Sequence, residues 1–367
     1  MLPRLENLAL AFGIASALMT TAAAAQVPPP DTNAYVLMDV GPVTVPTARG
    51  CISAPFTVPV ARPGWGYGSG PAAPDTNAPP SVADRKRAAA ERARERANLR
   101  ALAEDAQAGN PNASISIAHL LAAGSAAQQR EAVLWFELAA HQGHRDAFVQ
   151  LGYRYHRGLG VKANDRSSAY WYHGGATRGD RIAMLALGLM YAAGRGVPQD
   201  WTAAVDWWQK AAADPGQPAA FRFLGDAYAC GLGVARNFEA AVEAYRNAAK
   251  AGELNSNVQL GRIYESGCVP IDDEAAFDAY KTAADHGDPE AQIAISASFL
   301  QGRGTPHNAY LAYMWARMAE HRLPDGDLRA QASSRATEAA RFLSAGDRAD
   351  ADTFVAGMIK DGATPMR

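Results

Sequence analysis

The strongest pattern in the chain is a stripe of apolar and small residues that recurs with helical spacing. A Leu-Gly pair stands at residues 151–152 and returns at 187–188, 224–225 and 260–261, after 36, 37 and 36 residues. In each copy an alanine, or a serine in the last copy, precedes the leucine by four residues, and a tyrosine follows it by four. These three side chains share one face of a helix. Periodicity of this length predicts a solenoid of stacked helical repeats.

A second helical pattern follows each copy and carries bulky aromatic residues. Adjacent aromatic pairs stand at 135–136, 171–172 and 207–208, and Tyr245, Tyr280 and Trp315 take the second place of the pair in later copies. An Ala-Ala step and then a glycine follow most of them. A Gly-x-Gly-Val sequence joins the two halves at 158–161, 194–197 and 231–234. Each unit therefore predicts a helix, a glycine turn and a second helix.

The junction residues have physical reasons. Glycine just past a helix can adopt the left-handed conformation that caps free carbonyls, and a second glycine lets the chain reverse. Asp165, Asp200 and Asn237 stand where the second helix of a unit would begin, with side chains able to accept hydrogen bonds from its free amides. The glycine after each leucine lets two helices approach closely, and an aromatic ring fills the space between them. Because one helix pair cannot cover its own apolar face, neighbouring units must stack.

These residues resemble the Sel-1-like repeat family, a group of relatives of the tetratricopeptide repeats. The resemblance covers roughly residues 99–322, with decayed copies before Ala147 and an eroded copy from Ala291. It implies an all-α, right-handed superhelical solenoid of about six stacked helix-turn-helix repeats of 35–37 residues. It also implies an adaptor or scaffold that binds a protein or peptide. Two alternatives stay open: a hydrolase or β-lactam-binding protein like the cysteine-rich relatives, and a scaffold of a polysaccharide export complex, with polysaccharide as its ligand.

The chain is compositionally different on either side of the repeats at 113–322. Residues 1–25 combine Arg4, a short apolar stretch and a run of alanines, which predicts a secretory signal peptide. An uncleaved anchor and a cytosolic start are the alternatives. The apolar stretch is short for a membrane span, so we expect no stable span after cleavage and a periplasmic or secreted bacterial protein. Residues 323–367 predict capping helices, at 328–343 and 347–360, that close the solenoid.

Residues 26–82 are rich in proline and glycine and predict a largely irregular segment. A strand-forming docking segment at 34–60 is the alternative. Residues 83–112 predict a charged helix and a decayed half-repeat, with acids at helical spacing from the bases, as in Arg87 and Glu91. The whole chain has a formal net charge of −2 and lacks interleaved basic and aromatic patches, so no nucleic-acid partner is expected.

Catalytic and metal-binding motifs are missing from the sequence. It contains no His-Glu-x-x-His, no Gly-x-Ser-x-Gly and no phosphate-binding loop, and the recurring Gly-x-Gly-Val follows a helix and lacks the third glycine. His141 and His144 stand three residues apart, but no cysteine or carboxylate cluster accompanies them. We therefore predict a protein that is not an enzyme and has no catalytic residues, metal or cofactor.

The chain has three cysteines, Cys51, Cys230 and Cys268. Cys230 and Cys268 fall in equivalent inter-helix turns of neighbouring repeats, so they are the expected disulfide pair in an oxidising compartment. A bridge needs α-carbons within about 7 Å, however, and stacked repeats normally lie farther apart. Cys51 would then be free or bonded to another chain.

The resemblance also places a partner-binding groove. In tetratricopeptide-like helices the residues just after the glycine and just after the tyrosine point into the concave surface. Carried onto this chain, these positions are His119, Tyr153, His156, Leu189, Asp226, Arg262 and Glu265. Their chemistry varies between repeats, as expected of residues that recognise a partner. The alternative is that they are only solvated.

Overall fold

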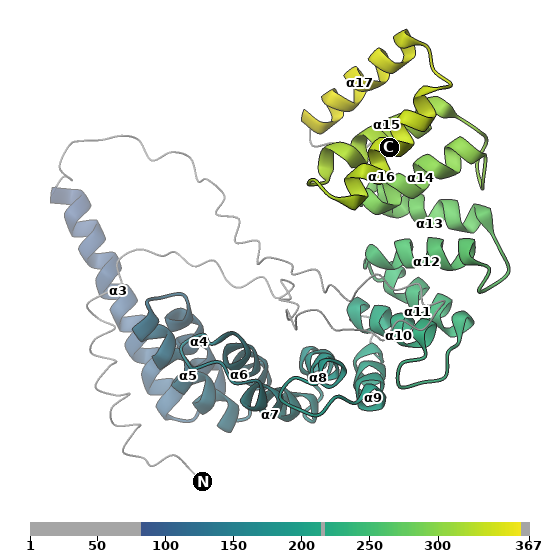
Figure 1. Cartoon of the computed structure of the whole chain (residues 1–367). Helices are drawn as coiled ribbons and strands as arrows, with labels where there is room; N and C mark the ends of the chain where they lie inside the picture. The colour runs from purple at the N-terminus through teal and green to yellow at the C-terminus, as the bar shows by residue number, and fades with distance from the viewer. Residues whose placement is uncertain (1–81, 214–216, 361–367) are drawn as a thin grey trace. The chain divides into compact units, whose positions relative to one another are not determined.

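The computed structural model describes residues 82–213 and 217–360, and within these ranges the regular structure is entirely helical (Figure 1). The helices are α3 (Val82–Gln107), α4 (Pro111–Ala122), α5 (Ala126–His141), α6 (Arg145–Arg157), α7 (Asp165–Ala176), α8 (Arg181–Ala193), α9 (Trp201–Ala212), α10 (Pro218–Cys230), α11 (Phe238–Lys250), α12 (Asn255–Ser266), α13 (Asp273–Asp285), α14 (Pro289–Gln301), α15 (Ala309–Arg322), α16 (Asp327–Ala340) and α17 (Ala345–Lys360). The all-α class and the repeated helix-turn-helix unit are therefore confirmed. The expected signal peptide, the docking segment at 34–60 and Cys51 lie outside the described residues.

The described helices belong to two compact units. The N-terminal unit contains α3 to α8 and the C-terminal unit contains α9 to α17, with the division between Gln199 and Asp200. Within a unit each helix up to α15 packs against the next one along the chain, as in the pairs α4 with α5, α6 with α7, and α10 with α11, and both α16 and α17 pack against α15. We call α4, α6, α8, α10, α12 and α14 the first helices of the repeats, and α5, α7, α9, α11, α13 and α15 the second helices.

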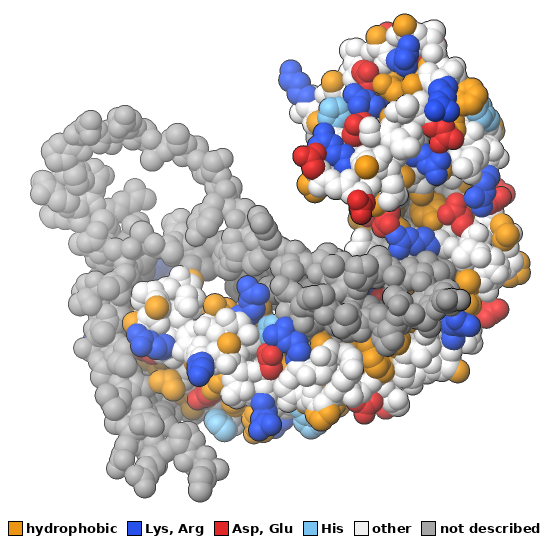
Figure 2. Space-filling view, viewed as in Figure 1, with side chains coloured by type: hydrophobic (Ala, Val, Ile, Leu, Met, Phe, Trp, Pro, Cys, Tyr) orange, Lys and Arg blue, Asp and Glu red, His pale blue; other side chains and the backbone are white. Residues whose placement is uncertain are grey.

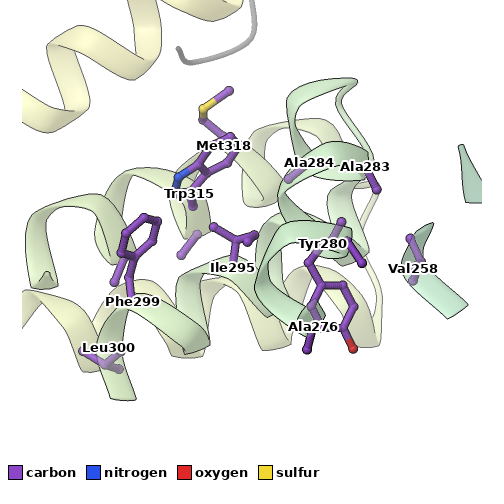
Figure 3. Close-up of a cluster of buried hydrophobic side chains, with 14 of the residues drawn as sticks. Val258, Ala276, Tyr280, Ala283, Ala284, Ile295, Phe299, Leu300, Trp315 and Met318 are labelled. Atoms are coloured by element: carbon purple, nitrogen blue, oxygen red, sulfur yellow. The ribbon is translucent and has the colours of Figure 1, made fainter. Parts of the chain in front are cut away.

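Each unit has its own apolar core. In the N-terminal unit Leu121, Phe136 and Leu151 have no exposed surface. In the C-terminal unit Ile295 and Trp315 are almost completely enclosed in a buried cluster (Figure 3). The cluster also includes buried residues of α16 and α17. Burying one such side chain contributes about 1.5–3 kcal/mol. The repeated leucine and aromatic positions are therefore the main source of stacking stability.

The glycine after the repeated leucine faces an aromatic ring of the second helix. A Cβ atom added to Gly225 would lie 2.6 Å from the Tyr245 ring, and one added to Gly261 would lie 2.6 Å from the Tyr280 ring. Real Cβ atoms do not approach other atoms this closely. In the N-terminal unit the same relation holds at Gly152, 2.8 Å from the ring of Tyr172. The expected role of this glycine in helix packing is thus confirmed.

The second glycine of the turn has a steric role that the sequence did not predict. A Cβ atom added to Gly160 would overlap the backbone oxygen of Gln129, near the start of α5 in the preceding repeat. One added to Gly304 would overlap the backbone oxygen of Asp273 in the same way. These turns pack directly on the preceding second helix, so the glycine allows stacking between repeats as well as chain reversal.

The predicted helix starts are correct in two of three cases. Asp200 accepts a hydrogen bond from the Ala203 amide, and Asn237 accepts one from the Ala240 amide, each over 3.0 Å. At α7 the capping residue is Asn164, not Asp165. Because Asn164 already accepts from the first turn, the carboxylate of Asp165 is available for side-chain partners.

Candidate partner-binding surface

The seven predicted groove residues all lie on first helices, but they are divided between the two units. His119 lies on α4, Tyr153 and His156 on α6, Leu189 on α8, Asp226 on α10, and Arg262 and Glu265 on α12. The first four belong to the N-terminal unit and the last three to the C-terminal unit. The surface of each unit therefore has its own geometry and electrostatics.

Two of the predicted groove residues are in the core. Leu189 is only 1% exposed, so it packs inside the N-terminal unit and presents no surface to a partner. His156 is 8% exposed, and its Nδ1 lies 2.9 Å from a carboxylate oxygen of Asp165. Arg195 donates to the same carboxylate over 3.1 Å. The imidazole thus connects α6 to the start of α7, and this internal contact explains why a position next to the repeated tyrosine is closed to solvent.

Burial, His156 and Arg195 together determine the pKa of Asp165. Burial acts to raise the pKa of this carboxyl group, but the hydrogen bonds and charges of His156 and Arg195 together lower it below its ordinary value. The carboxylate is therefore held in its ionised form. Arg303 in the C-terminal unit contacts Asp273 at the start of α13 in the same manner, at 2.7 Å. Both arginines stand between the two glycines of a turn, so the pair recurs where neighbouring repeats meet.

In the C-terminal unit Asp226 is at the centre of a bonded network. The hydroxyl of Tyr245 donates to one oxygen of Asp226 over 2.6 Å, and Arg222 donates to the other over 3.1 Å. Arg222 also lies 3.5 Å from Glu253. Burial raises the pKa of Asp226, although Arg222 and Tyr245 act to lower it. This acid therefore stabilises contacts within the unit instead of facing an external ligand.

Arg262 and Glu265 are bonded in the same way. Arg262 forms an ion pair with Glu290, and the hydroxyl of Tyr280 donates to Glu265 over 2.9 Å. Burial, and then the charge of Glu265, raise the pKa of Tyr280 well above its ordinary value, so it remains a donor. The sequence contained a signal for these contacts, because tyrosine replaces the tryptophan or phenylalanine of other copies at the second aromatic place.

The N-terminal unit contains a buried arginine that the repeat pattern did not single out. Arg154 on α6 is 6% exposed, and its guanidinium carbon lies 4.7 Å from the centre of the Phe136 ring. His119 contacts the same ring edge-on, with 5.2 Å between the ring centres. Among the described residues no acid lies within ion-pair distance of Arg154, and its Nε is buried without a hydrogen-bond partner. The sequence did contain a signal for this arginine. The equivalent positions of other repeats hold the apolar residues Met190 and Ile263, which are buried.

The aromatic contact does not compensate for this burial. A cation over an aromatic face contributes about 2 kcal/mol when desolvated. Removing an ion from water costs several kcal/mol after relaxation. Burial accordingly lowers the pKa of Arg154, and burial followed by the charge of Arg154 lowers the pKa of His119. Arg154 thus carries a positive charge beside Phe136 that no acid of the described residues pairs with.

The predicted disulfide between Cys230 and Cys268 is wrong. Cys268 is a free, half-buried cysteine, and Cys230 is disulfide-bonded, so the two are not bonded to each other. Cys230 ends α10 before the capping Gly231, whereas Cys268 follows the capping Gly267 of α12. The two residues therefore occupy different places in their turns.

The described part of the chain offers neither a metal cluster nor a membrane span. No group of three or more histidine, cysteine or acidic side chains that could hold a metal ion occurs there. His144, which the sequence paired with His141, is the residue before α6 and makes no side-chain capping bond. None of the helices from α3 to α17 is long and apolar enough to cross a membrane.

The repeats match the Sel1 repeat family model in six segments. The matched segments are residues 117–144, 147–180, 181–214, 218–253, 255–288 and 289–320. They make up more than half of the chain. The chain belongs to the Sel1 repeat family. Sel1 repeats generally mediate protein–protein interactions, and proteins of this family are generally non-catalytic scaffolds.

Solved structures of other Sel1 repeat proteins are similar to this one. A protective antigen of uropathogenic Escherichia coli, c5321, is 26% identical with a TM-score of 0.58, and the match covers 73% of this chain and 61% of the antigen. This Sel1 protein therefore spans about three fifths of the antigen. A Sel1 repeat protein from Oxalobacter formigenes is 29% identical with a TM-score of 0.49, over 53% of this chain and 78% of the other. No curated protein sequence matches the chain.

Proposed function

We propose that this Sel1 protein is a non-enzymatic adaptor that binds a protein partner in the bacterial periplasm or outside the cell. The observation that carries the proposal is that Sel1 repeats, which generally mediate protein–protein interactions, form both compact units. The signal-like composition of residues 1–25 supports the location. The description of the Escherichia coli relative as a protective antigen also supports it.

The first helices of the N-terminal unit are the favoured contact surface. The groove positions of the C-terminal unit are engaged by ion pairs and tyrosine hydroxyls, as at Asp226 and Glu265. In the N-terminal unit Tyr153 is half-buried and has no hydrogen-bond partner among the described residues. A tyrosine with part of its ring and its hydroxyl available is a common anchor in protein interfaces. The competing surface is that of the second helices, where Tyr170 on α7 is 71% exposed.

Affinity capture tests both the function and the surface. The full-length, tagged protein is crosslinked in its native host, and captured proteins are identified by mass spectrometry. We expect reproducible protein partners whose capture falls at least tenfold in Tyr153→Ala and is unchanged in Tyr170→Ala, with the circular dichroism of both variants like that of the unmodified protein. The reverse result would move the contact to α7, and capture of no specific protein would overturn the adaptor function.

The same preparation addresses the alternative functions. Turnover of a chromogenic β-lactam by the purified protein would support the hydrolase alternative. Co-purification of cell-surface polysaccharide in place of protein would support a role in polysaccharide export. The adaptor proposal expects neither result.

A further inference from the structure

The N-terminal unit buries a positive charge beside unpartnered polar groups. The guanidinium of Arg154 and the imidazole of His119 both contact the Phe136 ring. The guanidinium carbon lies 4.7 Å from the centre of that ring, and the centre of the imidazole lies 5.2 Å from it. Phe136 itself has no exposed surface. The two cationic or potentially cationic groups are thus held in a fixed position by a rigid ring between α4, α5 and α6.

The environment of Arg154 supplies donors without an acceptor. Its Nε is buried and unbonded, and its two Nη nitrogens have no described hydrogen-bond partner but are not fully sealed from solvent. Near His119, the Nδ1 of His144 is also buried and unbonded. Asp146 is close enough to raise the pKa of His119, yet it forms no ion pair with Arg154. Each of these groups except Asp146 can donate a hydrogen bond, and an anion would satisfy them.

Other repeats show that this arrangement is not required for the fold. The position of Arg154, three residues after the repeated leucine, is occupied by Met190, Ala227 and Ile263 in the next three repeats. These three residues are at most 1% exposed and pack in the core. An arginine at this place in one repeat therefore adds a charged binding group to an otherwise apolar position.

We propose that Arg154, with His119 and Tyr153 beside it, binds a carboxylate side chain of an acidic protein segment. Arginine pairs with carboxylates in a planar geometry with two parallel hydrogen bonds, and such pairs are strongest where water is excluded. Tyr153 adjoins Arg154 on α6 and offers an aromatic ring and a hydroxyl. The inference rests on the adaptor function proposed above and names the chemistry of the partner at this unit.

A peptide-binding experiment tests the site independently of any captured partner. The full chain is titrated with tetraglutamate, blocked at both ends, and with blocked tetraglutamine, which has nearly the same shape but no charge. We expect saturable binding of the glutamate peptide alone. Arg154→Met should weaken it at least tenfold, because methionine fills this place in the next repeat and should preserve packing. The matched control is Arg157→Met, one turn along α6 at an exposed position, and should leave binding unchanged.

The imidazole of His119 reports whether the ligand sits at this site. Its pKa is lowered by burial and by Arg154, with His144 acting in the same direction and Asp146 opposing them. A carboxylate bound to Arg154 should offset that charge, so the NMR-measured pKa of His119 should rise when the glutamate peptide binds. In Arg154→Met the pKa should rise without peptide and show no further response. A purely structural role for Arg154 would not make His119 respond to the peptide.

Other results would overturn the inference. Equal binding by Arg154→Met, binding of the glutamine peptide, or a His119 that ignores the peptide each contradicts the carboxylate site. Displacement by inorganic phosphate with no binding of the glutamate peptide would reassign the site to a free oxyanion. If the peptide binds through Arg154 but no protein is captured from cells, the site stands and the adaptor function fails. If proteins are captured equally well by Arg154→Met, the function stands and this site is not its contact.

Discussion

In the C-terminal unit Arg222 and Arg262 on the first helices form ion pairs with acids, whereas the N-terminal unit leaves Arg154 without an acid among the described residues. The same Sel1 scaffold holds both arrangements, with Ile263 in the C-terminal unit at the position equivalent to Arg154. Figure 2 shows basic and acidic side chains interspersed over the C-terminal unit on the face turned to the viewer. A fixed repeat core thus accommodates a paired charge in one unit and, at Arg154, an unpaired charge in the other.

The largest effect is expected where a paired charge is removed. Asp226→Ala leaves Arg222 and the hydroxyl of Tyr245 without their acceptor, and breaking a buried pair costs about 3–5 kcal/mol. The loss should appear as a lower denaturant midpoint for unfolding, measured by circular dichroism. The control is Asp325→Ala, whose side chain is 97% exposed in its ion pair with Arg329. Equal midpoints for the two variants would show that the network does not stabilise the unit.

A packing change should cost somewhat less. Gly225→Leu places side-chain atoms where a Cβ alone would already lie 2.6 Å from the Tyr245 ring. Overpacking costs about 1–3 kcal/mol, and the rigid ring places this site at the upper end. Gly357→Leu is the matched control, because this glycine lies in α17 with nothing within 4 Å of an added Cβ. There the substitution should stabilise the helix, since leucine has the better helix propensity. A Gly225 variant that melts at the unchanged temperature would contradict the packing role.

Removing the unpaired charge of Arg154 should raise the stability of the N-terminal unit, whereas the two changes above lower the stability of the C-terminal unit. Arg154→Met replaces a buried cation by the residue found at Met190, and replacing buried charges by apolar groups stabilises proteins by about 1–2 kcal/mol at the lower end of the known range. The unfolding midpoint should therefore rise, while Arg157→Met at an exposed position should change it little. Destabilisation by Arg154→Met would mean that the guanidinium contributes to folding and would remove the contrast between the two units.

Much of the fold could be predicted from sequence because stacking imposes a strict period. Each leucine, glycine and aromatic recurs at intervals of 35–37 residues, and a recurring constraint is visible without coordinates. The capping of α7 by Asn164 could not be separated from capping by Asp165, because both side chains can accept from free amides and differ by one position. Helix ends depend on local geometry that the repeat period does not specify.

The candidate site was less predictable because it depends on neighbours that are distant in sequence. Leu189 and His156 occupy positions that the family resemblance assigns to a groove, but packing against adjacent helices buries them. Asp226 meets a tyrosine 19 residues away, and no local pattern predicts that contact. Arg154 could have been found, because it is the charged exception in a column of core residues. A departure from the repeat consensus is therefore visible in the sequence, whereas the contacts that bury a consensus position are not.

The smallest predicted effect is a pH dependence that also distinguishes the units. Burial, and then Arg154, lower the pKa of His119 below its ordinary value of 6.5. Below pH 6.5 the unfolded chain takes up a proton at this histidine before the folded chain does, so stability is fully present above pH 6.5 and is lost as the pH falls toward the lowered value. One pH unit of this difference corresponds to about 1.4 kcal/mol. Burial raises the pKa of Asp226, so its titration opposes acid unfolding in the C-terminal unit.

Urea unfolding at about pH 7.5 and about pH 5.5 measures this dependence, because the two values lie on either side of the ordinary histidine pKa. The free energy of unfolding should fall between them, and the fall should be smaller in His119→Leu, which carries the residue of the equivalent position 189. His141→Leu removes an exposed histidine from the same unit and controls for the loss of an imidazole. Arg154→Met should give a result between the unmodified protein and His119→Leu, because it removes one cause of the pKa shift and leaves burial in place. If the unmodified protein and His119→Leu lose the same free energy of unfolding between the two pH values, His119 does not carry the effect. Arg154 and burial beside Phe136 would then not determine how the N-terminal unit responds to acid.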